Sequence, residues 1–284
     1  MVLGSDDRSP NGVGYVYAFE QKTGNVRWKY RAGAGAMADL VRDEERVLAV
    51  TLGDELVCLD LSTGRPRWRF SSGWVNEKIT NVAAAPAVNE GRVLFGGQNG
   101  VVHALDATYG QLIWKRDVGA AVITPLVVAS GAVYFGTSDQ RIHRLPLDPA
   151  AAHAELELGG NPFGPPLRLG DSLLLLVYDG PDAASLRSVD LTLNGVRWRR
   201  EAPGGWSSAR AYLWRGNALV GSEQGRLAAF SQDGSEEWAD AFAGVIRGIG
   251  VADGGLYVGT LRGTVYAYEP APPLDGKALN PHVP

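Results

Sequence analysis

A tryptophan-ended phrase recurs along this chain and constrains its fold more than any other feature. In each copy an apolar strand pattern ends in an acidic or polar residue, a turn with glycine follows, and a tryptophan closes the phrase. Five copies occur, at 16–28, 56–68, 102–114, 186–198 and, with one residue deleted, 227–238. Self-similarity with a period of about 40 residues is typical of a repeat architecture. Most of the conspicuous residues in these copies are therefore expected to have a structural role in the repeat.

The segments before each phrase predict three further strands per repeat. An apolar run ending in a small residue precedes each acid-ending strand, and Asn99-Gly100 and Asp179-Gly180 are expected to be two-residue turns between such strands. We call these two strands B and C, and the tryptophan-bearing strand D. An earlier apolar segment, strand A, is predicted at 37–41, 82–88, 122–128, 165–169, 208–213 and 246–251. Four antiparallel strands, repeated radially, predict an all-β β-propeller with seven blades, or eight if residues are missing from the chain.

The chain ends leave the first and last blades incomplete. Met1 falls at the start of a B strand, and after Tyr268 there is only a weak D candidate at 277–279. We predict one propeller domain over 1–270 and a proline-rich tail over 271–284. Either upstream residues are missing, or the tail packs into the seam between the first and last blades.

These repeats resemble the PQQ-like propeller family, whose blades dock through tryptophans. They look equally like the propeller lipoprotein of the outer-membrane β-barrel assembly machine. The resemblance implies an extracytoplasmic, periplasmic location and assigns a structural docking role to Trp28, Trp68, Trp114, Trp198 and Trp238. Tryptophan-aspartate propellers are disfavoured, because none of the 8 tryptophans is followed by aspartate.

The equipment of the family's quinoenzymes is missing. Those enzymes carry adjacent cysteines and carboxylate and amide ligands for calcium, whereas Cys58 stands alone and is interpreted as a core residue. No bound cofactor is therefore expected, pyrroloquinoline quinone included. His103 and His143 share one repeat column, which favours packing, so no metal site is predicted. No catalytic motif is found, and we predict that the protein is not an enzyme.

Charge and hydropathy exclude other classes of function. The formal net charge of −4 argues against nucleic acid as the main partner. Residues 1–10 do not form a signal peptide, and the apolar run at 173–177 is too short for a membrane span. Basic residues flank the docking tryptophans, and we interpret them as charges that protect outer edge strands from aggregation.

Residues outside the repeat pattern carry the functional predictions. Trp74 and Trp206 lie in equivalent D-to-A loops, and exposed aromatics beside loop residues such as Asn76 and Arg247 are typical of a protein interface. The D-to-A and B-to-C loops are expected to emerge on one face. Charged residues on the inner strands are predicted to line a polar channel: Asp39, Arg210 and Arg247.

The leading hypothesis is a monomeric, non-catalytic scaffold that binds a protein or peptide on the loop face. The alternative is a ligand-sensing or quinone-binding propeller, including a sensor domain of a larger protein. Blade four departs most from the pattern, because its D strand at 154–158 has lost the tryptophan. Sequence drift and an adapted docking surface both explain that loss.

Overall fold

The computed structural model describes residues 1–5, 13–33, 35, 39–73, 84–202, 204–252 and 254–268. These residues form strands and connecting turns, arranged as seven antiparallel sheets of three or four strands. The all-β seven-bladed propeller class predicted from the repeat is confirmed. In the described part of the chain, no helix has the length and apolar character needed to span a membrane.

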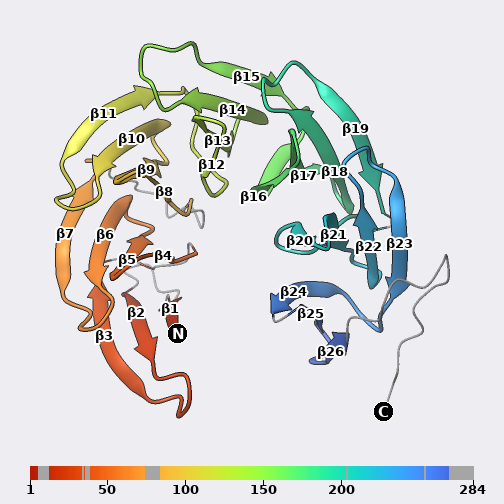
Figure 1. The fold of residues 1–284 in the computed structure, drawn as a ribbon, viewed down its shortest axis with the longest axis horizontal. Coiled ribbons are helices and arrows are strands. Elements are labelled where there is room, and N and C mark those ends of the chain that lie inside the picture. Colours follow the sequence, from red (N-terminus) through yellow and green to blue (C-terminus); the bar gives the residue numbers. More distant parts are fainter. Residues whose placement is uncertain are drawn as a thin grey trace. The chain divides into compact units, whose positions relative to one another are not determined.

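The chain divides into two compact units, which are described separately. Unit 1 comprises Met1–Asp139 and Leu145–His153, and unit 2 comprises Gln140–Arg144 and everything from Ala154 onward. Within each unit, consecutive sheets follow one another in chain order (Figure 1). That the whole chain forms a single domain over 1–270 stays a prediction.

Unit 1 holds the first three sheets and the start of the fourth. The first sheet has three strands, β1 (Val2–Ser5), β2 (Gly14–Phe19) and β3 (Val26–Ala32). The second sheet contains β4 (Val41–Asp43), β5 (Arg46–Val50), β6 (Glu55–Asp60) and β7 (Pro66–Ser71). The third contains β8 (Ala87–Asn89), β9 (Arg92–Gly96), β10 (Val101–Asp106) and β11 (Leu112–Asp117). The fourth begins with β12 (Val127–Ala129) and β13 (Ala132–Thr137) and continues through β14 (Arg141–Pro146) to β15 (Ala154–Glu157).

Unit 2 holds the end of the fourth sheet, including β15, and the last three sheets. The fifth sheet contains β16 (Asn161–Leu169), β17 (Ser172–Gly180), β18 (Ala183–Asp190) and β19 (Val196–Glu201). The sixth contains β20 (Tyr212–Trp214), β21 (Asn217–Gly221), β22 (Arg226–Phe230) and β23 (Glu236–Ala241). The seventh has three described strands, β24 (Ile246–Ala252), β25 (Gly255–Thr260) and β26 (Val265–Tyr268). The D candidate at 277–279 lies outside the described residues.

Some inner strands are shorter than the sequence predicted, whereas β16 and β24 contain the whole of the predicted segments 165–169 and 246–251. The segment 122–128 yields only β12, and 208–213 yields only β20, which starts at Tyr212. The physical reason is that hydroxyl side chains replace ladder partners just before these strands. The Thr124 hydroxyl accepts a hydrogen bond from the Gly136 N–H at 2.7 Å, and the Ser208 hydroxyl accepts one from the Gly221 N–H at 3.1 Å.

The hydrophobic core lies between consecutive sheets. In the second sheet, strands B and C are buried on both faces, so β5 and β6 carry nearly continuous apolar runs. In unit 1, Leu56 and Trp68 of the second sheet pack in one cluster with Phe95 of the third. Outer strands instead alternate: β7 buries Trp68 and exposes the arginines on both sides of it. Burial on one face and charge on the other is the pattern expected of a D strand at a sheet edge.

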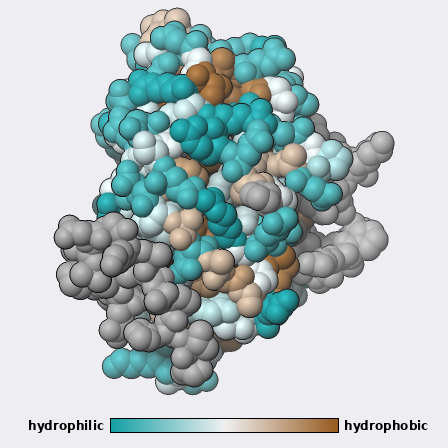
Figure 2. Space-filling model, turned by 90° about the vertical axis from the view of Figure 1, so that its right-hand side faces the viewer, coloured by the Kyte–Doolittle hydropathy of each residue, from teal (hydrophilic) through white to brown (hydrophobic). Residues whose placement is uncertain are grey.

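Figure 2 shows the face on which β19 and β23 are drawn in Figure 1. Most side chains on this face are hydrophilic, with smaller hydrophobic patches between them. Several of the outer-strand arginines are paired with acids. Arg197 of β19 binds Asp171 at 2.8 Å, and Arg67 of β7 binds Asp60 at 2.5 Å.

Candidate functional site

The first tryptophan of the repeat reaches into the next sheet. The Trp28 indole N–H donates to the Leu61 carbonyl at 2.9 Å, in the C-to-D turn of the second sheet. Gly64 of that turn lies over the ring, because a Cβ built on Gly64 would be 2.5 Å from the indole carbons Cδ2 and Cε3. Trp28 therefore joins two sheets through one hydrogen bond and one face-on contact.

The same arrangement recurs twice. Trp68 donates to the Ala107 carbonyl at 3.0 Å and lies under Gly110. In unit 2, Trp198 donates to the Gln232 carbonyl at 2.8 Å, and its ring lies under Gly234. Trp28, Trp68 and Trp198 thus act as structural contacts between sheets.

Two tryptophans of the column differ. The buried Trp114 indole N–H has no hydrogen-bond partner among the described residues. Trp238 packs edge-on against Trp214, with ring centroids 5.8 Å apart. In the fourth sheet, Ala154 of β15 pairs with Arg144 of β14. In the other sheets, the docking tryptophan occupies this position of strand D, opposite strand C. The loss of the tryptophan from blade four is thus a local change to alanine.

The recurrent acid at the end of strand C shapes the turn. Asp60 accepts hydrogen bonds from the backbone N–H groups of Ser62 and Thr63 at 3.0 and 2.9 Å. Asp106 does the same for Thr108 and Tyr109 at 2.9 and 2.8 Å. Side-chain bonds from Ser62, Arg67 and Thr63 hold the pKa of Asp60 well below its ordinary value. These carboxylates are therefore turn residues.

Of the two predicted partner-binding tryptophans, the structure describes only Trp206. Trp74 and Asn76 lie outside the described residues. The expectation that Trp206 is exposed is wrong, since its side chain is only 1% exposed. Its indole N–H donates to the Arg200 carbonyl at 3.0 Å, and its ring meets Phe230 edge-on at 5.7 Å. The D-to-A loop carrying Trp206 folds inward because the indole ring fills space between the fifth and sixth sheets. The sequence position of Trp206, outside the docking column, did not indicate this burial.

Arg247 lies at the junction of two loops in unit 2. Its guanidinium donates to the Ser207 carbonyl at 3.2 Å and to Glu223 at 3.2 Å. Ser207 belongs to the D-to-A loop before the sixth sheet, and Glu223 belongs to the B-to-C turn within it. The Arg247 side chain remains 48% exposed, so it is accessible to a partner.

Backbone hydrogen bonds hold the two kinds of loop at one end of the sheets in unit 2. The Phe242 N–H donates to the Gly225 carbonyl at 2.8 Å, and the Leu261 N–H donates to the Val245 carbonyl at 2.9 Å. We call the exposed side chains at this end the loop surface: Glu223, Gln224, Arg247, Leu261 and Arg262. It combines charges with one large apolar side chain, because Leu261 is 64% exposed.

The predicted channel residues belong to different units. Asp39 is exposed and precedes β4 in unit 1. Arg210 is half-buried and precedes β20 in unit 2, where Arg247 also lies. Their assignment to a channel stays a prediction.

The sequence analysis did not identify two buried charged groups. The Asp54 carboxylate is 1% exposed and accepts hydrogen bonds from the Ser72 hydroxyl at 2.6 Å and the Gln98 N–H at 3.0 Å. Burial raises its pKa, although both hydrogen bonds act in the opposite direction. Asp54 occupies a B-to-C turn with positive φ, where aspartate is common, so its position gave no distinctive signal.

Arg187 forms the second group, in unit 2. It is 5% exposed and donates to the Asp179 carboxylate, the Leu158 carbonyl and the Ser185 hydroxyl. Arg199 pairs with the same Asp179 at 3.1 Å. The predicted turn at Asp179-Gly180 is wrong for this reason: Asp179 stays in β17, and the turn falls at 181–182.

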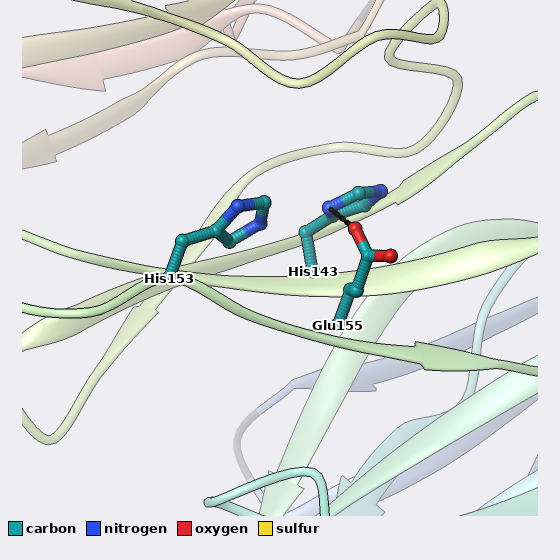
Figure 3. Close-up of side chains that lie close together, drawn as sticks. All are labelled: His143, His153 and Glu155. Carbon is teal, nitrogen blue, oxygen red and sulfur yellow. Dashed lines mark ion pairs between the residues drawn. The ribbon is translucent and has the colours of Figure 1, made fainter.

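A buried histidine and a partly exposed carboxylate lie opposite each other on the β14–β15 hairpin. His143 is fully buried and pairs across the hairpin with Glu155, with His143 Nδ1 and Glu155 Oε2 3.7 Å apart. The His143 ring and the Glu155 carboxylate face each other across the hairpin (Figure 3).

Comparison with known proteins assigns the family and the fold. A family model described as "Outer membrane protein assembly factor BamB" matches residues 12–94 and 72–272. The BamB of Yersinia pestis is 25% identical over 272 residues, covering 89% of this chain and 66% of its own length. The serine/threonine-protein kinase AfsK of Streptomyces griseus is 30% identical over 126 residues, covering 42% of this chain and 16% of the kinase. The chain thus spans less than two thirds of the length of these curated relatives.

A solved structure agrees on the fold. The crystal structure of BamB from Moraxella catarrhalis superimposes with a TM-score of 0.75 at 18% identity, covering 93% of this chain and 82% of the other.

Proposed function

Because the chain belongs to the family of the outer membrane protein assembly factor BamB, we propose that it is a non-catalytic scaffold that binds a protein partner during envelope protein assembly. The observation that carries this proposal is the family match, which runs through nearly all of the described sheets. The same relatives support a location outside the cytoplasm, where outer-membrane proteins are assembled.

The loop surface of unit 2 is the proposed contact. An exposed leucine bordered by Arg247, Arg262 and Glu223 offers an apolar centre with a charged rim, which is the composition of many protein interfaces. Backbone bonds between the loops fix these side chains before binding, which limits the entropy lost on association. The acidic turn residues and the docking tryptophans have structural roles in the repeat, so they are not assigned to partner binding.

Leu261→Asp and Arg247→Glu test this assignment. Each variant is expected to weaken capture of outer-membrane assembly proteins from a detergent extract of the source cell envelope, while the melting temperature stays within a few degrees of the wild type. The captured proteins are identified by mass spectrometry. Equal capture of assembly proteins by wild type and both variants would exclude the loop surface.

Leu213→Asp is the matched control. Leu213 is also an exposed leucine of unit 2, 50% accessible, but it lies in β20 next to the A-to-B turn, at the other end of the sixth sheet. We expect this variant to capture partners as the wild type does. If no assembly protein is enriched by the wild type, the scaffold function itself is refuted.

A second candidate is a sensor domain within a larger protein. The resemblance to 126 residues of the serine/threonine-protein kinase AfsK favours it, because a segment similar to this chain there forms part of a larger protein kinase. Titration with pyrroloquinoline quinone and calcium, read by absorbance and thermal shift, tests the quinone-binding version. No spectral change and no shift in melting temperature would count against it.

A further inference from the structure

The C-to-D turn of the fifth sheet departs from the glycine pattern of the other turns. Gly64 and Gly110 stand four residues after the acid that ends strand C, and each covers an indole of the sheet before it. Four residues after Asp190 the chain has Asn194 instead, and Gly195 follows it. The fourth sheet has an alanine at the register of the docking tryptophan, so no such indole precedes this turn. A side chain is therefore tolerated where other repeats need glycine.

The Asn194-Gly195 step is open on both of its residues. The Asn194 side chain is exposed, and a Cβ built on Gly195 would meet nothing within 4 Å. Within the described residues, no backbone carbonyl accepts a hydrogen bond from the Gly195 N–H. Because glycine has no side chain and a wide conformational range, its nitrogen can approach the side-chain carbon Cγ of the asparagine before it.

The Asn99-Gly100 step of the third sheet has the same two residues in a closed setting. The Gly100 N–H donates to the Gly97 carbonyl at 3.2 Å, and a Cβ on Gly100 would lie 2.9 Å from the Ala120 nitrogen. The Asn99 side-chain oxygen accepts a hydrogen bond from the Val101 N–H at 3.0 Å. The nitrogen and the amide of this step are thus both held in place.

We infer that Asn194 is a site of spontaneous deamidation. The Gly195 backbone nitrogen attacks Cγ of Asn194, and the new N–Cγ bond forms as the bond from Cγ to Nδ2 breaks. Ammonia leaves with the proton that the Gly195 nitrogen gives up, and a five-membered succinimide remains. Solvent water then opens this ring at one of its two carbonyl carbons and leaves aspartate or isoaspartate at position 194.

Thr192 slows this reaction. The Asn194 side-chain amide donates to the Thr192 hydroxyl oxygen at 2.7 Å, and the Thr192 hydroxyl in turn donates to the Asp190 carboxylate. This bond orients the amide and must break when ammonia leaves, but it does not cover Cγ. Removing the hydroxyl should therefore speed up the loss of the amide.

Deamidation would change the charge and the backbone of the turn. The Asn194 N–H lies 3.4 Å from Asp190 Oδ1, so a carboxylate at position 194 places two like charges in one turn. Isoaspartate also lengthens the backbone next to Leu193, which is 5% exposed and has a φ of 62°. The turn lies at the other end of the sheet from the D-to-A and B-to-C loops, so the inference does not depend on the proposed scaffold function.

Incubation of the purified full chain at mildly alkaline pH, followed by tryptic digestion and mass spectrometry, tests the inference. The three Asn-Gly steps fall in separate peptides, 188–197 for Asn194, 93–115 for Asn99, and 9–22 for Asn11, which lies outside the described residues. We expect Asn194 to deamidate several-fold faster than Asn99, with aspartyl and isoaspartyl products. In urea the two rates should converge, because the protection of Asn99 comes from the fold.

Three variants complete the experiment. Gly195→Ala should slow the reaction several-fold, because a methyl group hinders the attacking nitrogen, and it should fold normally since its Cβ meets nothing and its φ lies outside the left-handed region. Thr192→Val should deamidate faster than the wild type. Asn194→Asp, which mimics one product, should lower the melting temperature.

Two results would overturn the inference. One is an equal rate of deamidation at Asn194 and Asn99 in the folded protein. The other is an unchanged rate at Asn194 in the Gly195→Ala variant. A slow reaction of Asn99 that persists in urea would overturn its structural basis, because the sequence around Asn99 would then explain the difference.

Discussion

Gly64 lies face to face with the indole of Trp28, and a Cβ on this glycine would approach ring carbons to 2.5 Å. The glycine belongs to the turn of one repeat and the tryptophan to the repeat before it. The same pairing joins Gly110 to Trp68 and Gly234 to Trp198. The turn glycine is therefore required for two reasons: its positive φ and the ring packed against it.

Gly64→Ala is expected to destabilise the protein strongly. A methyl group cannot fit against Trp28 without displacing the ring, and overpacking of this kind costs about 1–3 kcal/mol in addition to the strain of a positive φ. The loss is measured as the free energy of unfolding in urea.

Gly24→Ala separates the two effects. Gly24 occupies the equivalent turn of the first repeat with a φ of 74°, close to the 69° of Gly64, but its Cβ would meet nothing within 4 Å. This variant should show the strain alone, about 1–2 kcal/mol. Equal losses for the two variants would mean that the indole contact carries no stability.

Trp68→Phe and Trp114→Phe should differ in cost. Both remove an indole N–H, but only that of Trp68 is hydrogen-bonded, to the Ala107 carbonyl. We expect Trp68→Phe to lose about 1 kcal/mol more than Trp114→Phe, since the latter removes an unpaired buried donor. Chemical denaturation of both variants measures the difference. A larger loss for Trp114→Phe would contradict the assigned contacts.

Asp54→Asn is expected to be nearly neutral at pH 7, and Asp54→Ala to cost about 2–3 kcal/mol. The asparagine oxygen can still accept from Gln98, and its amide can donate to the Ser72 hydroxyl, whereas alanine removes both hydrogen bonds from this buried position. Asparagine also tolerates the positive φ at this turn. Urea unfolding of both variants measures these costs.

The pH dependence of Asp54 has a defined sign. Burial raises the pKa of Asp54 in the folded state above its value of 3.8 in the unfolded chain, so the folded state binds the proton more tightly. The stability that this protonation contributes is therefore lost as the pH rises from 3.8 through the folded-state pKa. When the pH is lowered from 7 to 4, the stability of Asp54→Asn relative to the wild type should therefore fall. A rise would show that the hydrogen bonds outweigh burial.

His103 should act in the opposite direction. It packs against Phe70 and Phe95, with ring centroids 5.0 and 5.8 Å away, and burial lowers its pKa from 6.5 to about 4. The unfolded chain then takes up a proton first, so the stability contributed by the neutral ring is lost as pH falls from 6.5 towards 4.

The comparison of His103→Gln with the wild type at pH 7 and pH 5 isolates this effect. The wild type should lose about 1–2 kcal/mol more than the variant over this interval, since one unit of pKa corresponds to about 1.4 kcal/mol. Parallel pH profiles would show that His103 is protonated as easily in the folded state as in the unfolded one.

The repeat pattern was sufficient to predict the sheets. Strand B and C segments such as β5 and β6 are buried on both faces, so their apolar runs are continuous and easy to recognise. The inner strands were placed less well, because Thr124 and Ser208 form side-chain bonds to backbone groups that a hydropathy pattern does not reveal.

The sequence by itself determined the number of sheets, their strand order and the residues that mark each turn, because these depend on short-range periodicity repeated many times. Only the tertiary structure decided the environment of single side chains. It buried Trp206 between two sheets, kept Asp179 in a strand beside Arg187, and placed Glu155 opposite His143. These outcomes depend on which neighbours meet across strands and sheets, and a linear pattern does not contain that information.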